Sequence, residues 1–278
     1  MNLHVIDTGF FKLDGGAMFG VVPKVMWEKL NEPDVNNLCT WAMRCLLVED
    51  GDRLILIDTG IGDKQSEKFF SHFHPHGEAS LIGSLAEKGF HPNDITDVLL
   101  THLHFDHCGG AVMRNKNGDF VPTFPNAKYW SHKDHWEWAR TPNPREKASF
   151  LAENFLPLEE REQIHFLTNG EELIPGLSVK TMYGHTEAML IPHIKYKDNT
   201  VVFMADLLPS TAHLPLAYVM SYDIRPLDTM AERGKFLQEA HENNYVLFYE
   251  HDAVNQCSRT IETRKGIRAS ETFRLSDL

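Results

Sequence analysis

The segment Thr101–His107 concentrates metal-binding side chains more densely than any other part of the chain, with His102, His104, Asp106 and His107 inside six residues. Neutral imidazoles and carboxylates are good ligands for zinc and similar divalent cations. The apolar run Ile95–Leu100 predicts a short buried strand before the segment, and Cys108–Ala111 predicts a tight turn that opens a helix after it. Sites in α/β proteins commonly form where a strand ends, so the segment predicts a metal site.

The spacing within the segment is compatible with one ion or two. His102 and His104 share a face by the two-residue period of a strand, and Asp106 and His107 in the turn can reach a second position. A chance cluster is the alternative, because the chain has 16 histidines. His72, His74 and His76 illustrate it: they lack an acid, and we interpret them as solvated or as lining the mouth of the site. At Cys108 we expect a small buried residue rather than a ligand.

Composition excludes several classes of partner. The formal net charge of −12 argues against nucleic acid, which requires clustered Lys and Arg. No apolar run approaches the roughly 20 residues that span a bilayer, so we expect no membrane contact. The N-terminus lacks the basic start and apolar core of a secretory signal. Four scattered cysteines without CxxC spacing fit reduced thiols, and we expect a cytoplasmic protein.

Strand patterns fall into two batches, each with flanking helices. A helix is predicted at about Ser80–Lys88, and another at Pro226–Asn243. Two strand-rich halves predict an α/β fold of two mixed sheets packed face to face and covered by helices, a four-layer αβ/βα sandwich. The predicted strands are Leu3–Asp7, Thr40–Val48, Arg53–Asp58, Asp97–Thr101, Ala127–Ser131, Leu177–Met182, Ile191–Lys195, Thr200–Ala205 and Tyr245–Tyr249.

We expect one domain over residues 1–278, with a helical insertion at about 132–165 and a short helix in the tail. The insertion is rich in aromatic residues, and a lid, a substrate wall, a dimer surface and plain core packing are all compatible with it. Oligomeric state stays open, with a homodimer as one alternative.

Three further strand ends carry a candidate ligand. His185 follows the strand Leu177–Met182, Asp206 ends the strand Thr200–Ala205, and His251 follows the strand that starts at Tyr245. A single histidine in such a place is more often a hydrogen-bonded structural residue. The repetition at three separate strand ends is what indicates a shared site.

These motifs together resemble the metallo-β-lactamase-fold hydrolases over nearly the whole chain. The residues that carry the resemblance are Leu56–Gly60, Thr101–His107, Gly184–Thr186, Ala205–Asp206 and Glu250–His251. Within that superfamily, Leu13–Lys24 is similar to the N-terminal segment of the quorum-quenching lactonase and organophosphate-hydrolase branch. That segment could form a mobile apolar flap or a buried loop.

The resemblance implies two divalent metal ions, with zinc as the default and Mn, Fe or Co as alternatives. It places His102, His104 and His185 on the first ion, Asp106, His107 and His251 on the second, and Asp206 between them. Asp58 looks like the family's buried aspartate behind the site, which orients a ligand and must itself have partners.

Two departures from the family pattern stand out. Thr186 is followed by Glu187–Met189 rather than Pro-Gly, and Pro209 stands where some lactonases have a tyrosine that polarises the substrate carbonyl. His213 is one candidate for that role, with a surface or packing residue as its alternative.

The resemblance implies a hydrolase in which hydroxide between the ions attacks a lactone or ester carbonyl and Asp106 orients it. We expect a small-molecule ester or lactone substrate of the acyl-homoserine lactone type. A phosphotriesterase or thioesterase would use the same ions. A di-iron redox protein and a non-catalytic metal protein are the remaining alternatives.

Overall fold

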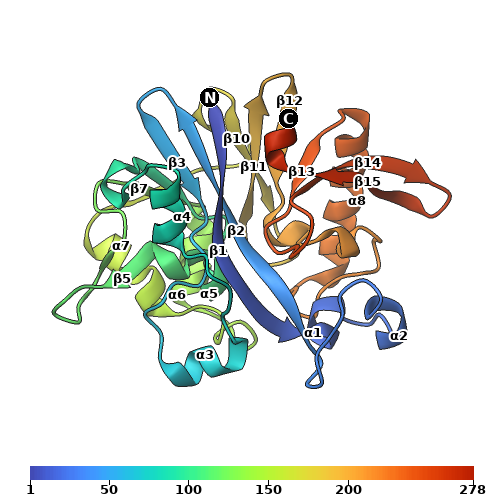
Figure 1. Cartoon of the computed structure of the whole chain (residues 1–278), viewed down its shortest axis with the longest axis horizontal. Helices are drawn as coiled ribbons and strands as arrows, with labels where there is room; N and C mark the ends of the chain where they lie inside the picture. The colour runs from blue at the N-terminus through green and yellow to red at the C-terminus, as the bar shows by residue number, and fades with distance from the viewer.

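The computed structural model describes residues 1–278 as two mixed β-sheets with helices on their outer faces (Figure 1). The first sheet has six strands in the order β1-β2-β3-β4-β7-β8. Strands β3, β4, β7 and β8 run parallel, so their carboxyl ends lie at one edge. The bounds are β1 Asn2–Asp14, β2 Leu38–Asp50, β3 Arg53–Ile57, β4 Asp97–Leu99, β7 Lys128–Ser131 and β8 Ile164–Phe166.

The second sheet has seven strands in the order β15-β14-β13-β12-β11-β10-β9, with β12 and β13 parallel. A separate two-stranded ribbon pairs β5 with β6. The bounds are β5 Val112–Arg114, β6 Phe120–Pro122, β9 Glu172–Ile174, β10 Leu177–Met182, β11 Met189–Tyr196, β12 Asn199–Phe203, β13 Val246–Phe248, β14 Cys257–Thr263 and β15 Gly266–Phe273.

Eight α-helices surround the sheets, and none is long and apolar enough to cross a membrane. In Figure 1, α4, α6 and α7 lie beside the first sheet and α8 lies on the far side of the second. The bounds are α1 Gly15–Phe19, α2 Lys24–Trp27, α3 Glu67–Phe73, α4 Leu81–Glu87, α5 Phe105–Cys108, α6 Lys133–Arg140, α7 Leu156–Glu160 and α8 Pro226–Glu242.

Alternating side chains of the central strands separate two layers of core. Leu46 and Val48 of β2 point into the cluster shared by the two sheets, which also contains Phe203 and Leu247. Leu47 between them points into the other cluster, beneath the helices of the first sheet. Successive side chains of a strand point to opposite faces of the sheet. A strand that is covered on both faces therefore needs apolar residues at successive positions. The predicted αβ/βα sandwich is confirmed.

Three local predictions need correction. The tail is mainly the hairpin β14–β15, and only Leu275–Asp277 after it forms a single 3₁₀ turn. The glycines after Cys108 do not open an α-helix: α5 precedes them, Gly109–Ala111 form a single 3₁₀ turn, and β5 follows. The insertion at 132–165 holds two short helices, α6 and α7, joined by irregular chain, and β8 begins at Ile164.

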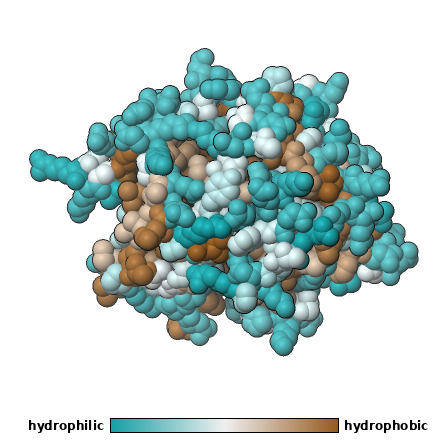
Figure 2. Space-filling model, turned by 180° about the vertical axis from the view of Figure 1, so that it is seen from behind, coloured by the Kyte–Doolittle hydropathy of each residue, from teal (hydrophilic) through white to brown (hydrophobic).

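Most of the rear surface is hydrophilic, and apolar side chains gather toward the side on which α1 and α2 lie in that view (Figure 2). Exposed apolar residues in this part of the chain are Val21, Val25, Met26 and Leu30. Because an isolated surface patch of this kind is common on globular proteins, it does not by itself identify a partner.

Candidate metal centre

Turns at the carboxyl ends of β3, β4, β10, β12 and β13 bring the predicted ligands to one end of the sandwich. Three of these turns contain a non-glycine residue in the left-handed region: Asp58 at φ 57°, Ala188 at φ 51° and Ala205 at φ 41°. Such strained residues concentrate at functional sites. Strand β4 ends at Leu99, so His102 and His104 lie in the loop after it and not on the strand itself. The prediction that His102 and His104 share one face of a strand is therefore wrong, although the two side chains do converge.

The first cluster comprises His102, His104, His185 and Asp206, whose ligand atoms lie within 4.8 Å of one another. His185 Nε2 is 3.1 Å from His104 Nδ1 and 3.0 Å from Asp206 Oδ2. His102 Nε2 lies 3.9 Å from the same carboxylate oxygen. All four side chains are buried.

The second cluster comprises Asp106, His107 and His251. His251 Nε2 is 3.1 Å from His107 Nε2 and 3.7 Å from Asp106 Oδ2. It also lies 3.1 Å from Asp206 Oδ1, the carboxylate oxygen that does not face His185. Asp206 therefore presents one oxygen to a histidine of each cluster.

The donor atoms at the centre suit divalent cations. His102 Nε2 and Asp206 Oδ1 are buried and have no hydrogen-bond partner, a costly arrangement for polar atoms. Imidazole nitrogens and carboxylate oxygens that converge in this way are the ligand set of zinc and related ions. Three ligands on each side plus a shared carboxylate leave positions open for water or substrate.

Charge within the cluster favours bound cations as well. Burial lowers the pKa of His185, but the Asp206 carboxylate outweighs it, and the pKa rises to about 10. Burial also lowers the pKa of His251, but Asp206 again outweighs this effect, and the pKa rises to about 9. The pKa of Asp206 lies well below its usual range, because His185 and His251 outweigh its burial. The Asp206 carboxylate therefore favours positive charge beside it. A bound cation provides that charge while the histidines stay neutral and able to act as ligands.

Side chains behind the ligands fix their ring orientations. Asp58 Oδ2 lies 3.0 Å from His107 Nδ1 and accepts a hydrogen bond from the Thr101 hydroxyl at 2.6 Å. The expected buried, partnered aspartate is thus present. Asp223 Oδ1 lies 2.8 Å from His185 Nδ1, and the carbonyl of Ala42 lies 2.8 Å from His251 Nδ1. Such outer partners set the tautomer that leaves the other ring nitrogen free for metal.

Glu250 is a second carboxylate behind His107. Its Oε2 is 3.1 Å from His107 Nδ1, the atom that also faces Asp58. Burial raises the pKa of Glu250 to about 8 against the opposing effect of His107. No separate role was predicted for Glu250, which was named only as part of the family motif. Its position next to His251 was the one indication in the sequence.

Two polar residues of the insertion, His135 and Glu146, contact the ligand-bearing loop, and neither was predicted from the sequence. His135 of α6 accepts a hydrogen bond from the backbone N–H of Leu103 at its Nε2, 2.8 Å away. The Glu146 carboxylate lies beside His104, with Oε1 3.6 Å from His104 Nε2. The aromatic content of 132–165 was the only signal, and it pointed to a wall rather than to these polar contacts.

A cavity of about 360 Å³ opens onto the metal centre. Its lining includes the apolar residues Leu13, Met18, Phe73, Phe105 and Met220. It also includes the polar residues Arg145, Glu146, Ser149, Ser221 and Tyr222. Burial, followed by the effect of the Asp106 carboxylate, raises the pKa of the Tyr222 phenol, so Tyr222 stays neutral and can donate a hydrogen bond. A substrate with an apolar part and a polar reacting group fits this mixed lining.

His213 does not reach the cavity, so its expected role at a carbonyl is wrong. The ring is fully buried and stacks on Phe19 with centroids 4.7 Å apart. Its two nitrogens are occupied, by Ser210 Oγ at 2.8 Å and the carbonyl of Met18 at 3.0 Å. Burial lowers the pKa of His213 to about 3. The packing alternative is therefore the one that the structure supports.

In the segment Leu13–Lys24, for which a flap and a buried loop were the alternatives, Gly15–Phe19 form α1, whereas Val21 and Lys24 are exposed. Met18 and Phe19 of α1 are buried, and Met18 also lines the cavity. His72, His74 and His76 lie at and after the end of α3 and join no cluster that could hold an ion. Cys108 is fully buried and donates to the carbonyl of Leu103, as expected for a residue that is not a ligand.

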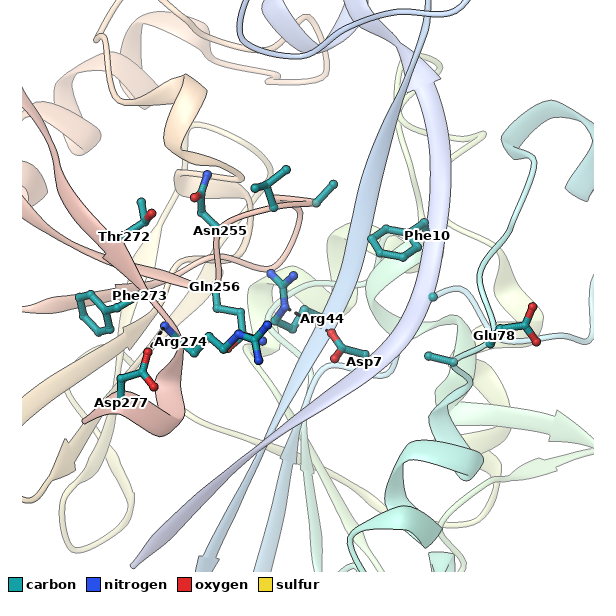
Figure 3. A pocket seen from close by; sticks show the side chains of 14 residues that line it. Asp7, Phe10, Arg44, Glu78, Asn255, Gln256, Thr272, Phe273, Arg274 and Asp277 are labelled. Atoms are coloured by element: carbon teal, nitrogen blue, oxygen red, sulfur yellow. Dashed lines mark hydrogen bonds and ion pairs between the residues drawn. The ribbon is translucent and has the colours of Figure 1, made fainter.

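A second cavity, of about 690 Å³, lies away from the ligands and is lined by Asp7, Arg44, Gln256 and Arg274 among others (Figure 3). Arg44 of β2 forms an ion pair with Asp7 at 3.3 Å. Its Nη1 donates to the carbonyls of Tyr249 and Asp252, at 2.7 and 3.0 Å. Arg44 thus braces the turn that carries His251.

A sequence profile described as "Metallo-beta-lactamase superfamily" matches residues 44–251. An N-acyl homoserine lactonase of Bacillus sp. is 26% identical over 152 residues, which is 51% of this chain and 54% of that protein. A lactonase of the same description from Bacillus thuringiensis is 32% identical over 97 residues, 31% of this chain and 35% of the relative. The chain spans about half the length, or less, of these curated relatives.

Solved structures match over a longer stretch. A probable metal-dependent hydrolase from Staphylococcus aureus superimposes with a TM-score of 0.87 at 29% identity, covering 98% of both chains. The dizinc quorum-quenching lactonase AidC has a TM-score of 0.81 at 22% identity, covering 98% of this chain and 95% of its own. At 22% identity, the similarity to AidC shows a shared fold only.

Proposed function

Because the chain belongs to the metallo-β-lactamase superfamily, we propose that it is a metal-dependent hydrolase that opens lactones or cleaves related esters. The observation that carries this proposal is the pair of histidine–carboxylate clusters joined by Asp206 beneath a half-apolar cavity. An acyl-homoserine lactone is the substrate type we favour, because relatives over about half of the chain are described as lactonases of that type.

We propose His102, His104, His185 and Asp206 as the ligands of one ion, and Asp106, His107, His251 and Asp206 as those of the other. Bound there, two divalent cations would lower the pKa of water and polarise an ester carbonyl. Zinc is the ion we expect, with Mn, Fe and Co as alternatives for the same ligands.

The remaining roles belong to the protein itself. Asp106, at the border of the cavity and the second cluster, would orient the attacking water and accept its proton. The apolar lining residues, such as Leu13, Met18 and Met220, would hold an acyl chain and exclude solvent. The phenol of Tyr222, which also lines the cavity, would donate a hydrogen bond to the oxygen on which charge develops.

A substrate panel tests the function directly. Purified protein of measured metal content should hydrolyse acyl lactones of graded chain length faster than a phosphotriester or a thioester. Faster turnover of either of the latter would move the assignment to a phosphotriesterase or thioesterase. Iron as the activating metal together with oxygen consumption would indicate a redox protein, and bound metal without turnover of any substrate would indicate a non-catalytic site.

Tyr222→Phe is expected to lower kcat for lactone hydrolysis by about 100-fold, the usual loss for one oxyanion donor, with KM and metal content little changed. Steady-state kinetics and metal analysis by emission spectroscopy measure these quantities. Tyr196→Phe, at the distant end of β11, is the matched control and should behave as wild type. An unchanged kcat in Tyr222→Phe would contradict the proposed role of the phenol in the reaction.

The wider context of the chain is also part of the proposal. We propose that residues 1–278 act as one hydrolase domain in the cytoplasm, where the four buried, unpaired cysteines would stay reduced. A homodimer stays a prediction, and light scattering of the purified protein measures it.

A further inference from the structure

The Glu146 side chain is a buried carboxylate that links the insertion to the first metal cluster. It is 3% exposed, although it comes from the irregular chain between α6 and α7. Its Oε2 accepts hydrogen bonds from Trp138 Nε1 at 2.8 Å and Asn143 Nδ2 at 2.5 Å. Its Oε1 accepts one from the Thr186 hydroxyl at 2.6 Å. These three donors hold the carboxylate rigidly in place.

The fourth neighbour of that carboxylate is His104. Nδ1 of His104 points toward His185 Nε2, 3.1 Å away, and so toward the centre of the cluster. Nε2 points the other way, is buried without a hydrogen-bond partner, and lies 3.6 Å from Glu146 Oε1. The 3.6 Å separation is longer than a hydrogen bond, so the contact is an electrostatic one between the imidazole and the carboxylate.

Other contacts of the same segment hold His104 in this orientation. The His104 ring packs against Phe150 with centroids 4.8 Å apart. The N–H of Phe105 donates to the carbonyl of Ser149 at 3.0 Å. In this orientation the other tautomer would place the Nδ1–H against His185 and the Nε2 lone pair against the Glu146 carboxylate, which is electrostatically unfavourable.

We propose that Glu146 is a positioning residue for the first ion. With its carboxylate facing Nε2 of His104, it favours the tautomer that carries the proton at Nε2 and leaves the Nδ1 lone pair free for the ion, and through Thr186 it fixes the residue next to His185. Thr186 immediately precedes Glu187–Met189, where this chain departs from the family pattern. A carboxylate behind a ligand imidazole also increases the basicity of that ligand. The inference rests on the proposed metal-dependent function.

The decisive variant is Glu146→Gln, which keeps the size of the side chain and removes its charge. Stepwise titration of metal-free protein with Co²⁺ against a competing chelator should show a 10- to 100-fold loss of affinity at one position. The other position should change less than about threefold, because none of its ligands touches Glu146. Glu160→Gln, an exposed residue of the same insertion, is the matched control and should leave both affinities unchanged.

A second variant and a spectroscopic readout separate positioning from mere packing. Thr186→Val should weaken the same position in the same direction, by a smaller factor. In ¹⁵N-edited spectra of the zinc-loaded protein, His104 should be protonated at Nε2 in wild type and lose its protected N–H in Glu146→Gln. Thermal unfolding of the metal-free variants shows whether they are folded.

The inference is overturned if Glu146→Gln retains both affinities, or if both fall equally together with the unfolding temperature of the metal-free protein. Protein that binds two ions but hydrolyses no substrate would contradict the proposed function and leave the role of Glu146 standing. Wild-type protein that binds no divalent cation would contradict both.

Discussion

Asp206→Asn is expected to reduce bound metal from two ions per chain to one or none and to lower lactone hydrolysis by more than about 100-fold. The reason is the position of the carboxylate, whose two oxygens lie 3.0 and 3.1 Å from His185 and His251. An amide offers only one oxygen and no charge, so it cannot serve both clusters. His102→Ala should have a comparable effect through the first cluster.

Metal analysis of dialysed protein and initial rates on one lactone measure these losses. Asp198→Asn, an exposed residue in the β11–β12 turn, makes the same chemical change away from the site and should alter neither quantity. If Asp206→Asn retained two ions and full activity, the proposal that Asp206 is shared by two ions would be wrong, and so would the proposed dinuclear site.

Arg233→Met is expected to destabilise the protein by about 3 kcal/mol. Arg233 of α8 is fully buried and donates to the carbonyls of Leu207, His213 and Tyr218, at 2.9, 3.0 and 2.8 Å. Burial lowers its pKa to about 10, so it stays charged at neutral pH. Methionine fills similar space but leaves three carbonyls without their donor, in the segment that follows Asp206.

Urea unfolding of the metal-free protein measures this change in the free energy of unfolding. Arg264→Met, in the exposed turn between β14 and β15, is the control and should change stability by less than about 0.5 kcal/mol. A change that small in Arg233→Met would mean that water satisfies the three carbonyls as well as the guanidinium does.

The sequence predicted the sandwich and the ligand candidates because both leave strong local patterns. Apolar runs that end in His or Asp, as at His185 and Asp206, combine a buried strand with side chains that a strand end seldom carries. The motif around His102 needs no knowledge of the rest of the chain. The long-range convergence of the other ligands followed from the shared edge of parallel strands and from the family resemblance.

The outer partners could not be found in the same way. Glu146 and His104 are 42 residues apart, and a glutamate in a charged, irregular segment looks solvated. His213 failed for a different reason: its position shortly after Pro209, where some lactonases have the tyrosine, suggested a role at the carbonyl, whereas Phe19 from a distant segment stacks on its ring. The hairpin β14–β15 was missed because charged residues such as Arg259 and Glu262 obscure its alternation. Each case depends on tertiary contacts rather than on local preference.

Each of the two clusters draws its side chains from both halves of the chain, with His104 and His107 on the first half and His185 and His251 on the second. A cation in either position would therefore act as a reversible cross-link between the two sheets, removable by a chelator and by acid. The same ions that would activate the substrate would then set how long the enzyme survives heat, so a cell short of metal would lose the protein as well as its activity.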